Sequence, residues 1–231
     1  RSLFINMFMS YYIDSAEPHI FIHIPKTAGR SIFSLINNNY SYTHITNSRT
    51  HNLNFHSTLR DVEDFICPLG VAIPTFTVVR NPWTRIASWY FFRQEILRRA
   101  LPRLKNGRKT NKTVRDYDII FKEHEAMLHS FDKWLTFYHN QLWDYTWFSA
   151  SDNQVSWLKS NTMSVSKIIK FENLNAEITD VEIFKGMELP VLNKGPIEDP
   201  YKNLFNGYTR NLVKVLYEED IDTFKYSFTE L

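Results

Sequence analysis

The chain of 231 residues lacks several features that would assign it to a class at once. Cys67 is the only cysteine, so an intrachain disulfide and a structural zinc site built on several thiolates are excluded. No apolar stretch has the length that spans a bilayer, and no signal peptide pattern is present. A net charge of +2 implies nothing by itself about nucleic acid or membranes, and we expect no nucleic-acid partner.

The same absences bear on location and organisation. A single cysteine with no signal or membrane segment favours the cytoplasm, although the start at Arg1 rather than methionine makes a missing anchor weak evidence. No internal repeat and no low-complexity tract interrupts the chain. We therefore expect one domain over residues 1–231, long enough to bury a sizeable core.

Short β-rich runs alternate with segments of helical apolar spacing. The runs are His19–Ile24, Tyr42–Ile45, Pro74–Val79 and Lys167–Phe171, and the helical segments include Thr58–Ile66, Trp83–Leu97 and Phe131–Tyr138. Such alternation predicts an α/β fold with a central parallel sheet flanked by helices. Ligands of open α/β folds bind at the carboxyl edge of the sheet.

One segment differs from the rest in charge. Residues 93–115 hold nine basic side chains and a single acid, Glu95. Pro102, Asn106 and Gly107 predict an interruption of any helix there, so we expect the middle of the segment to be an exposed loop and the segment to be an insertion on the domain. Two interpretations stay open: a solvated loop, or a platform for an anionic acceptor.

The most informative segment is His19–Ser31, an apolar strand that breaks at Pro25 into a turn and then a helix. The first N–H groups of such a helix point at one spot, which binds phosphate or sulfate, and Lys26 adds a full charge. Lysine precedes glycine here, whereas the triphosphatase loop requires Gly-Lys-Ser/Thr. The site is thus phosphate-loop-like without being that of a nucleoside triphosphatase, and an ordinary turn with an exposed lysine is the alternative.

A second strand end has the same character. Thr77–Tyr90 is an apolar run that ends at Arg80, and Pro82 suits the first position of the helix that follows. Arg85 and Ser88 share a face of that helix. Arg80 and Ser88 can bind a second phosphate, although a capped helix with surface arginines would look the same.

Together, Pro-Lys-Thr-Ala-Gly-Arg-Ser at 25–31 and Arg-Asn-Pro-Trp-Thr-Arg-Ile-Ala-Ser at 80–88 resemble the nucleotide-binding motifs of sulfotransferases that use 3′-phosphoadenosine 5′-phosphosulfate (PAPS). The branch that this chain most resembles contains the heparan sulfate 2-O-sulfotransferases and other carbohydrate sulfotransferases. Further similar pieces follow in order: Asn153-Gln154, Trp157-Leu158, Ile169–Leu174, Leu189–Asn193 and Leu216–Tyr226. Arg30 departs from the pattern, because the family more often has a small residue or threonine there.

The resemblance implies a role for each motif. Lys26 would contact the oxygen that bridges phosphate and sulfate, where negative charge builds during transfer. The loop residues Thr27, Ala28, Gly29, Arg30 and Ser31 would hold the 5′-phosphate, and Arg80 with Ser88 the 3′-phosphate. PAPS is then the co-substrate and no metal is needed. The resemblance implies that the acceptor is a hydroxyl group of a carbohydrate, which is anionic if the basic segment is a platform.

A hydroxyl acceptor requires a general base. His56, just before a helix that Ser57 or Thr58 can cap, matches the segment in which this branch has a histidine base. His51 is a weaker candidate, and Glu172 is the carboxylate alternative, with ordering of the site as its other role. His19 and His23 share one face of the first strand and are expected to be structural.

Some questions stay open at this level. Trp143, Trp147 and Phe148 can stack on sugars or pack in the core. A phosphate-loop kinase that uses ATP, or a module that binds sulfated glycans or nucleotides without turnover, are the rival functions. The identity of the acceptor and the oligomeric state cannot be derived from the sequence.

Overall fold

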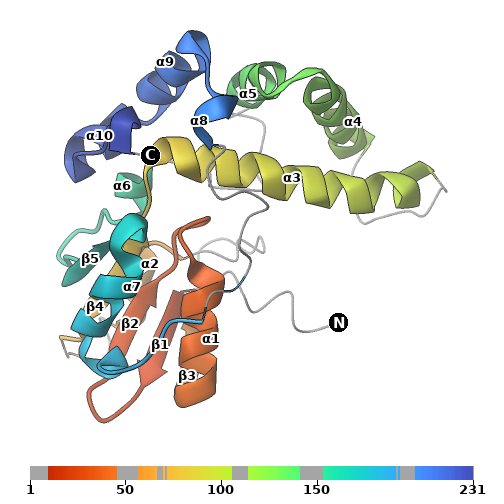
Figure 1. Cartoon of the computed structure of the whole chain (residues 1–231). Coiled ribbons are helices and arrows are strands. Elements are labelled where there is room, and N and C mark those ends of the chain that lie inside the picture. Colours follow the sequence, from red (N-terminus) through yellow and green to blue (C-terminus); the bar gives the residue numbers. More distant parts are fainter. Residues whose placement is uncertain are drawn as a thin grey trace.

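A computed structural model describes residues 10–45, 57–66, 70, 72–105, 114–140, 153–190, 192 and 201–230. Its sheet contains β1 (Ser10–Asp14), β2 (His19–Ile22), β3 (Ser41–Ile45), β4 (Thr75–Val79) and β5 (Lys167–Lys170) in the order β3-β1-β2-β4-β5. The four predicted strands are confirmed; three of them are shorter than predicted, and β3 begins one residue earlier. The fold is α/β, with a five-stranded sheet flanked by helices (Figure 1).

The expectation of a purely parallel sheet was wrong. β2, β4 and β5 pair in parallel, but β1 pairs antiparallel with both β2 and β3, so β1 alone runs against the other four. The sequence of β1, Ser-Tyr-Tyr-Ile-Asp, is short and joins β2 through a tight turn, which makes an antiparallel hairpin possible. The sheet is therefore mixed.

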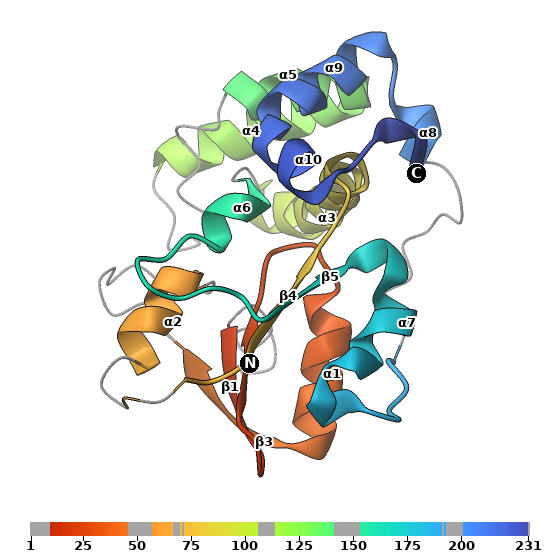
Figure 2. The same cartoon turned by 90° about the vertical axis from the view of Figure 1, so that its left-hand side faces the viewer.

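Helices cover both faces of the sheet. α1 (Gly29–Asn39) and α7 (Leu174–Glu177) lie on one face and α2 (Leu59–Ile66) on the other (Figure 2). An apolar core lies on each face of the sheet, because successive side chains of β2 point to opposite faces. Phe21 packs with Ile32 and Ile36 of α1, whereas Ile20 and Ile22 pack with Leu59 and Val62 of α2.

A layer of further helices lies beyond the carboxyl end of the parallel strands (Figure 1). It consists of α3 (Pro82–Lys105), α4 (Val114–His129), α5 (Phe131–Asn140), α6 (Gln154–Trp157), α8 (Tyr201–Leu204), α9 (Gly207–Leu216) and α10 (Glu218–Phe224). Its core is aromatic, with Trp83, Tyr90, Phe131 and Trp134 in one cluster. Four short 3₁₀ segments complete the described elements: Phe171–Asn173, Ile178–Asp180, Glu182–Phe184 and Phe228–Glu230. No helix in the described ranges is long and apolar enough to cross a membrane.

The basic segment at 93–115 starts as a helix, as predicted up to Leu97, but the helix runs further than expected. α3 continues through Pro102 to Lys105, and residues 106–113 lie outside the described part. Proline removes only its own N–H bond and lies within the last turn of the helix, so its cost there is limited. The expectation that Pro102 interrupts the helix was wrong.

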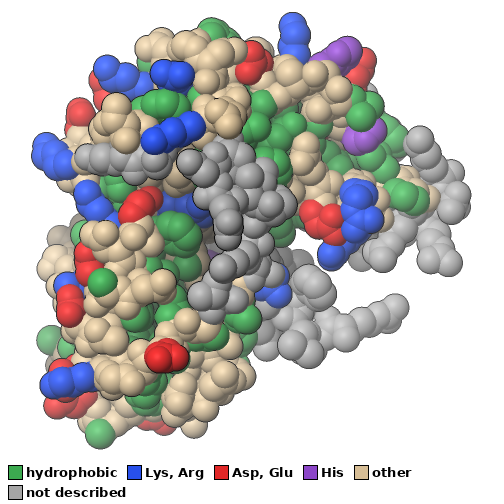
Figure 3. All heavy atoms as spheres, viewed as in Figure 1, with side chains coloured by type: hydrophobic (Ala, Val, Ile, Leu, Met, Phe, Trp, Pro, Cys, Tyr) green, Lys and Arg blue, Asp and Glu red, His purple; other side chains and the backbone are tan. Residues whose placement is uncertain are grey.

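Three arginines of this stretch are already paired. Arg93 is buried and forms an ion pair with Glu123 of α4, which also accepts a hydrogen bond from Trp134 Nε1. Arg98 and Arg99 both pair with Glu95, and Figure 3 shows basic and acidic side chains against each other on this part of α3. Much of the positive charge between residues 93 and 99 is therefore compensated.

Candidate active site

The turn between β2 and α1 has the predicted strand–turn–helix form. Lys26 and Ala28 have φ values of 70° and 69°, in the left-handed region. Thr27 Oγ1 donates to Ile24 O at 2.7 Å, and Ser31 N and Ile32 N both donate to Ala28 O. Two left-handed residues without glycine are costly, and these bonds hold the turn in that shape.

Gly29 is required by a close contact. A Cβ atom at this position would lie 1.8 Å from His23 Nε2, so no other residue fits. The His23 ring, which follows β2, also lies against Phe21, with ring centres 5.8 Å apart. His23 is buried, as is His19, whose Nδ1 lies 2.8 Å from Glu17 O. These contacts agree with the structural role predicted for both histidines.

Lys26 lies in an unusual environment for a lysine. Its ammonium group is 4.2 Å from the centre of the Phe92 ring of α3. Burial, followed by the positive charges of Arg80 and Arg30, lowers its pKa to about 7. Among the described residues, both charged groups that act on this ammonium are cations, so no described acid compensates the charge of Lys26. Arg30, whose position in the motif was unassigned, is exposed and contributes to this field.

The second turn follows β4 at Arg80. Asn81 is fully buried and its Oδ1 accepts a hydrogen bond from Trp83 N at 3.1 Å, so Asn81 caps α3. Pro82 is the first residue of that helix, as predicted. Asn81 N donates to Glu172 Oε1 at 2.9 Å and Asn81 Nδ2 donates to Ser227 O at 2.9 Å. Two distant parts of the chain therefore hold this turn in place.

The structure brings the two turns into direct contact. Arg80 Nη1 donates to Lys26 O at 3.2 Å, and Arg85 Nε donates to Pro25 O at 3.1 Å. The Arg80 guanidinium also lies 4.1 Å from the centre of the Phe171 ring and donates to Thr84 Oγ1. Ser88 lies one helical turn beyond Arg85 and is partly buried. Of the predicted site residues, Lys26–Ser31 and Arg80 are thus neighbours.

Gln154 is a residue whose part in the site the sequence did not reveal. Its side chain is fully buried; Oε1 accepts from Arg80 N and Nε2 donates to Arg80 O, both at 2.8 Å. Nε2 also donates to Asp220 Oδ2 at 3.1 Å, and Val155 N donates to Asp220 Oδ1 at 2.9 Å. One carboxamide therefore satisfies both main-chain groups of Arg80, as a neighbouring strand would. The pair Asn153-Gln154 was a signal of family resemblance only, and no local pattern indicated this role.

Glu172 has the positioning role that was the second option for it. Its Oε1 accepts from Asn81 N, and its Oε2 accepts from Tyr226 OH at 3.1 Å. Burial and the charge of Glu172 raise the pKa of Tyr226, which keeps the phenol protonated as the donor. The carboxylate is occupied in ordering the Arg80 turn.

His56 and His51 lie outside the described residues, as do Trp143, Trp147 and Phe148. The residue after His56 is described. Ser57 O accepts from Ser10 Oγ at 2.8 Å, and Ser10 Oγ accepts from His23 N at 3.2 Å. Ser57 is therefore linked by two hydrogen bonds to the histidine that packs on Gly29. Thr58 caps α2, as expected, because Asp61 N donates to Thr58 Oγ1 and Thr58 N donates to Asp61 Oδ2.

Metal ligands and the likeness to known proteins complete the description of the site. In the described part of the chain, no three His, Cys, Asp or Glu side chains gather in a group that could hold a metal ion. A model of the sulfotransferase family matches residues 9–227, a range that contains all five strands and both turns. No curated protein and no solved structure matches the chain significantly.

Proposed function

The chain belongs to the sulfotransferase family, and we propose that it moves the sulfuryl group of PAPS to a hydroxyl group of a carbohydrate acceptor. Membership in the family supports sulfuryl transfer in general. The choice of donor and acceptor depends on the motifs at 25–31 and 80–88 and on the resemblance to carbohydrate sulfotransferases. We take residues 1–231 as one sulfotransferase domain.

The excess of positive charge at Lys26 is the observation that carries the proposal. A partly buried lysine with a pKa lowered to about 7, next to Arg80 and Arg30, is unfavourable in the free protein. A ligand with several negative charges would relieve that cost. A phosphosulfate fits these residues, because the ammonium, the arginines and the N-terminus of α1 converge on one end of the sheet.

Each residue then has a role in binding or transfer. Backbone N–H groups of Thr27, Ala28, Gly29 and Arg30 hold the 5′-phosphate together with the hydroxyl of Ser31, whose own N–H donates to Ala28 O. Arg80 and Ser88 hold the 3′-phosphate. Lys26 donates a hydrogen bond to the bridging oxygen, on which negative charge develops as its bond to sulfur breaks. A new bond forms between sulfur and the acceptor oxygen, and the products are a sulfate ester and adenosine 3′,5′-bisphosphate.

We assign His56 as the base that takes the proton of the acceptor hydroxyl. The link from Ser57 through Ser10 to His23 supports this, since it ties the neighbour of His56 to the turn that carries Lys26. Glu172 is the less favoured base because both of its oxygens already accept hydrogen bonds.

Calorimetry with adenosine 3′,5′-bisphosphate tests the proposal. We expect binding without metal, and sulfuryl transfer from labelled PAPS to a member of a carbohydrate panel. Lys26→Ala and His56→Ala should each lower turnover by about 10²-fold or more while the protein stays folded. Binding of ATP with magnesium alone would indicate a kinase, and bisphosphate binding with no turnover on any acceptor would indicate a binding module.

A further inference from the structure

The ring of Phe92 on α3 covers the ammonium group of Lys26. Lys26 Nζ lies 4.2 Å from the centre of this ring, and both side chains are partly buried. Within the described ranges, no hydrogen bond or ion pair holds the ammonium, so the ring is the described group that fixes its place. The face of an aromatic ring carries a negative potential and attracts a cation, most strongly where water is partly excluded.

We propose that Phe92 is a positioning residue for sulfuryl transfer: its ring holds the Lys26 ammonium ready for the oxygen that bridges phosphate and sulfate. The inference rests on the proposed function and adds a residue to its site. Phe92 lies beyond both nucleotide-binding motifs, which end at Ser31 and Ser88, and it acts only through Lys26.

One face of α3 runs along the turn that carries Lys26. Arg85, Ser88 and Phe92 follow at helical spacing, so their side chains share this face. Arg85 is buried, and its Nε donates to Pro25 O at 3.1 Å. Phe92 lies about two helical turns further along, where it meets Lys26. The same helix face therefore contacts both the backbone of the turn and its ammonium group.

The Phe92 ring is itself held in place by the helical layer. The ring of Trp89, one turn earlier on α3, lies against it with ring centres 5.4 Å apart, and Trp89 is buried. Arg93, the next residue, forms the buried ion pair with Glu123 of α4. These contacts fix α3 at this point and limit the freedom of the ring. The ring can therefore order a flexible lysine side chain, which otherwise has many rotamers.

The charges around Lys26 explain why an aromatic ring suits this place. Arg80 and Arg30 are the described charged groups that act on the ammonium, and both are cations. Arg85 and His23 adjoin the same turn. A carboxylate beside Lys26 would also fix the ammonium, but it would repel a phosphosulfate. The ring attracts the ammonium without adding a negative charge to the site.

The pKa of Lys26 in the free protein tests the contact. Replacement of Phe92 by mono-, di- and trifluorinated phenylalanine keeps the shape of the ring but weakens its negative potential. The Lys26 pKa should fall with each fluorine, because the protonated form loses attraction. NMR of lysine-labelled protein measures this pKa, and Lys26→Arg assigns the signal. The same series at Phe91, whose ring lies against Tyr201, should leave the pKa unchanged.

Calorimetric titration with adenosine 3′,5′-bisphosphate at pH 5.5 tests the consequence for the nucleotide, because its 5′-phosphate supplies the oxygen that Lys26 contacts. Phe92→Leu keeps apolar bulk without a ring face and should weaken binding about tenfold, the size of one partly desolvated cation–π contact. Phe92→Tyr keeps the ring face and should bind within about twofold of wild type. The control Phe121→Leu changes an exposed ring on α4 and should have no effect.

Three results would overturn the inference: a Lys26 pKa that does not respond to the fluorines, wild-type affinity in Phe92→Leu, or an equal loss of affinity in Phe92→Tyr. Bisphosphate binding by the wild-type protein separates these results from failure of the proposed function. If the wild-type protein does not bind the bisphosphate, the proposed function fails. The fluorine series then still decides whether the ring holds Lys26, because it uses no ligand.

Discussion

At the scale of single residues, Lys26 combines two opposed requirements. Transfer needs its positive charge at the bridging oxygen, whereas its burial near Arg80 and Arg30 lowers its pKa to about 7. The free enzyme at neutral pH therefore carries this proton only about half of the time. A small change in pH then changes the fraction of enzyme that is competent to bind and react.

The first prediction concerns this titration. The value of kcat/KM for PAPS should fall as the pH rises through about 7, because this parameter reports ionisations of the free enzyme. The Lys26 pKa is lowered, so the active protonated form is present below pH 7 and lost above it. Measurement of kcat/KM for PAPS at pH values from 5.5 to 9 tests this fall. In Lys26→Arg the fall of kcat/KM should move above pH 9, because arginine stays protonated. If the fall stays near pH 7 in this variant, a group other than Lys26 causes it.

Sequence reasoning could place Lys26 but not its environment. The order Pro-Lys-Thr-Ala-Gly fixed the turn and its lysine, because a strand and an amphipathic helix flank it. That Gly29 is required by His23 could not be predicted, since that contact depends on how the strand and the turn approach each other. The same holds for Gln154, which lies 74 positions from Arg80 along the chain. Contacts between distant segments leave no periodic signal.

At the scale of elements, the Arg80 turn depends on partners from α6, α10 and the segment after β5. Replacement of Gln154 by leucine keeps the volume but leaves the buried N–H and C=O of Arg80 without their partner. We expect a loss of about 2–4 kcal/mol in the free energy of unfolding, measured by denaturant titration. Bisphosphate binding should weaken about tenfold, because Arg80 is no longer held in place.

The control for this variant is Asn211→Ala on the exposed surface of α9, which should change neither quantity. A Gln154→Leu protein that loses stability but keeps wild-type affinity for the bisphosphate would show that the carboxamide is structural only.

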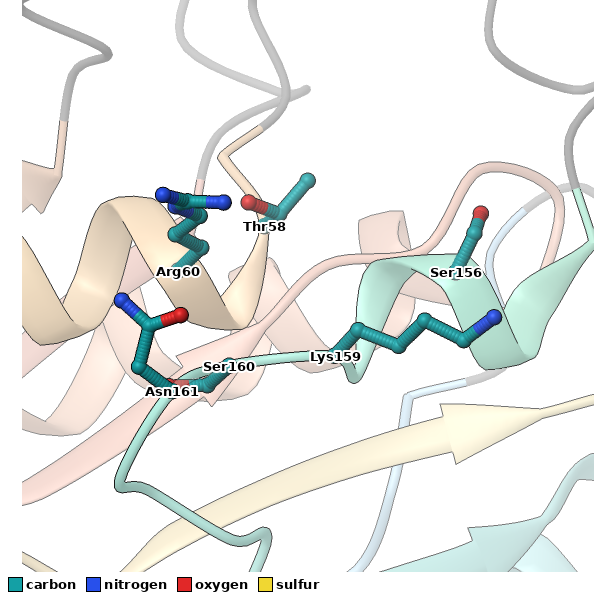
Figure 4. A pocket seen from close by; sticks show the side chains of 6 residues that line it. All are labelled: Thr58, Arg60, Ser156, Lys159, Ser160 and Asn161. Atoms are coloured by element: carbon teal, nitrogen blue, oxygen red, sulfur yellow. The ribbon is translucent and has the colours of Figure 1, made fainter.

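The lowered pKa of Glu63 leads to a second prediction at this scale, on the pH dependence of stability. Glu63 of α2 accepts hydrogen bonds from Ser160, Thr162 and Asn161, in the segment that borders a polar pocket next to α2 (Figure 4). Its pKa is lowered to about 2 in the folded protein, against an ordinary value near 4.5. The stability from its hydrogen bonds is therefore present above about pH 4.5 and lost as the pH falls toward 2. Glu63→Gln should be less stable than wild type at pH 7, and this deficit should shrink between pH 4.5 and 2. Denaturant titrations at pH 7, 4 and 3 measure it, and a deficit that does not change with pH would contradict the assignment.

At the scale of the whole molecule, the direction of the four predicted strands follows from their apolar runs and intervening helices. β1 was not predicted, because five residues with one apolar and two aromatic side chains have no long alternation. The continuation of α3 past Pro102 was also missed. Tertiary contacts such as the buried pair of Arg93 and Glu123 stabilise that helix, and local helix-breaking signals do not report them.

The last prediction concerns the uptake of a proton when the ligand binds to the two turns. Adenosine 3′,5′-bisphosphate brings negative charge to Lys26, Arg80 and Arg30, so it should raise the Lys26 pKa from about 7. Binding at pH 8 should then take up a fraction of a proton at Lys26, whereas at pH 5.5 Lys26 is already protonated and contributes no uptake. Calorimetry in two buffers with different ionisation enthalpies measures this uptake. Lys26→Met should bind with no such uptake at pH 8; equal uptake in that variant would place the titrating group elsewhere. At a hundredfold excess over its dissociation constant, the ligand should also stabilise the fold by about 2.7 kcal/mol.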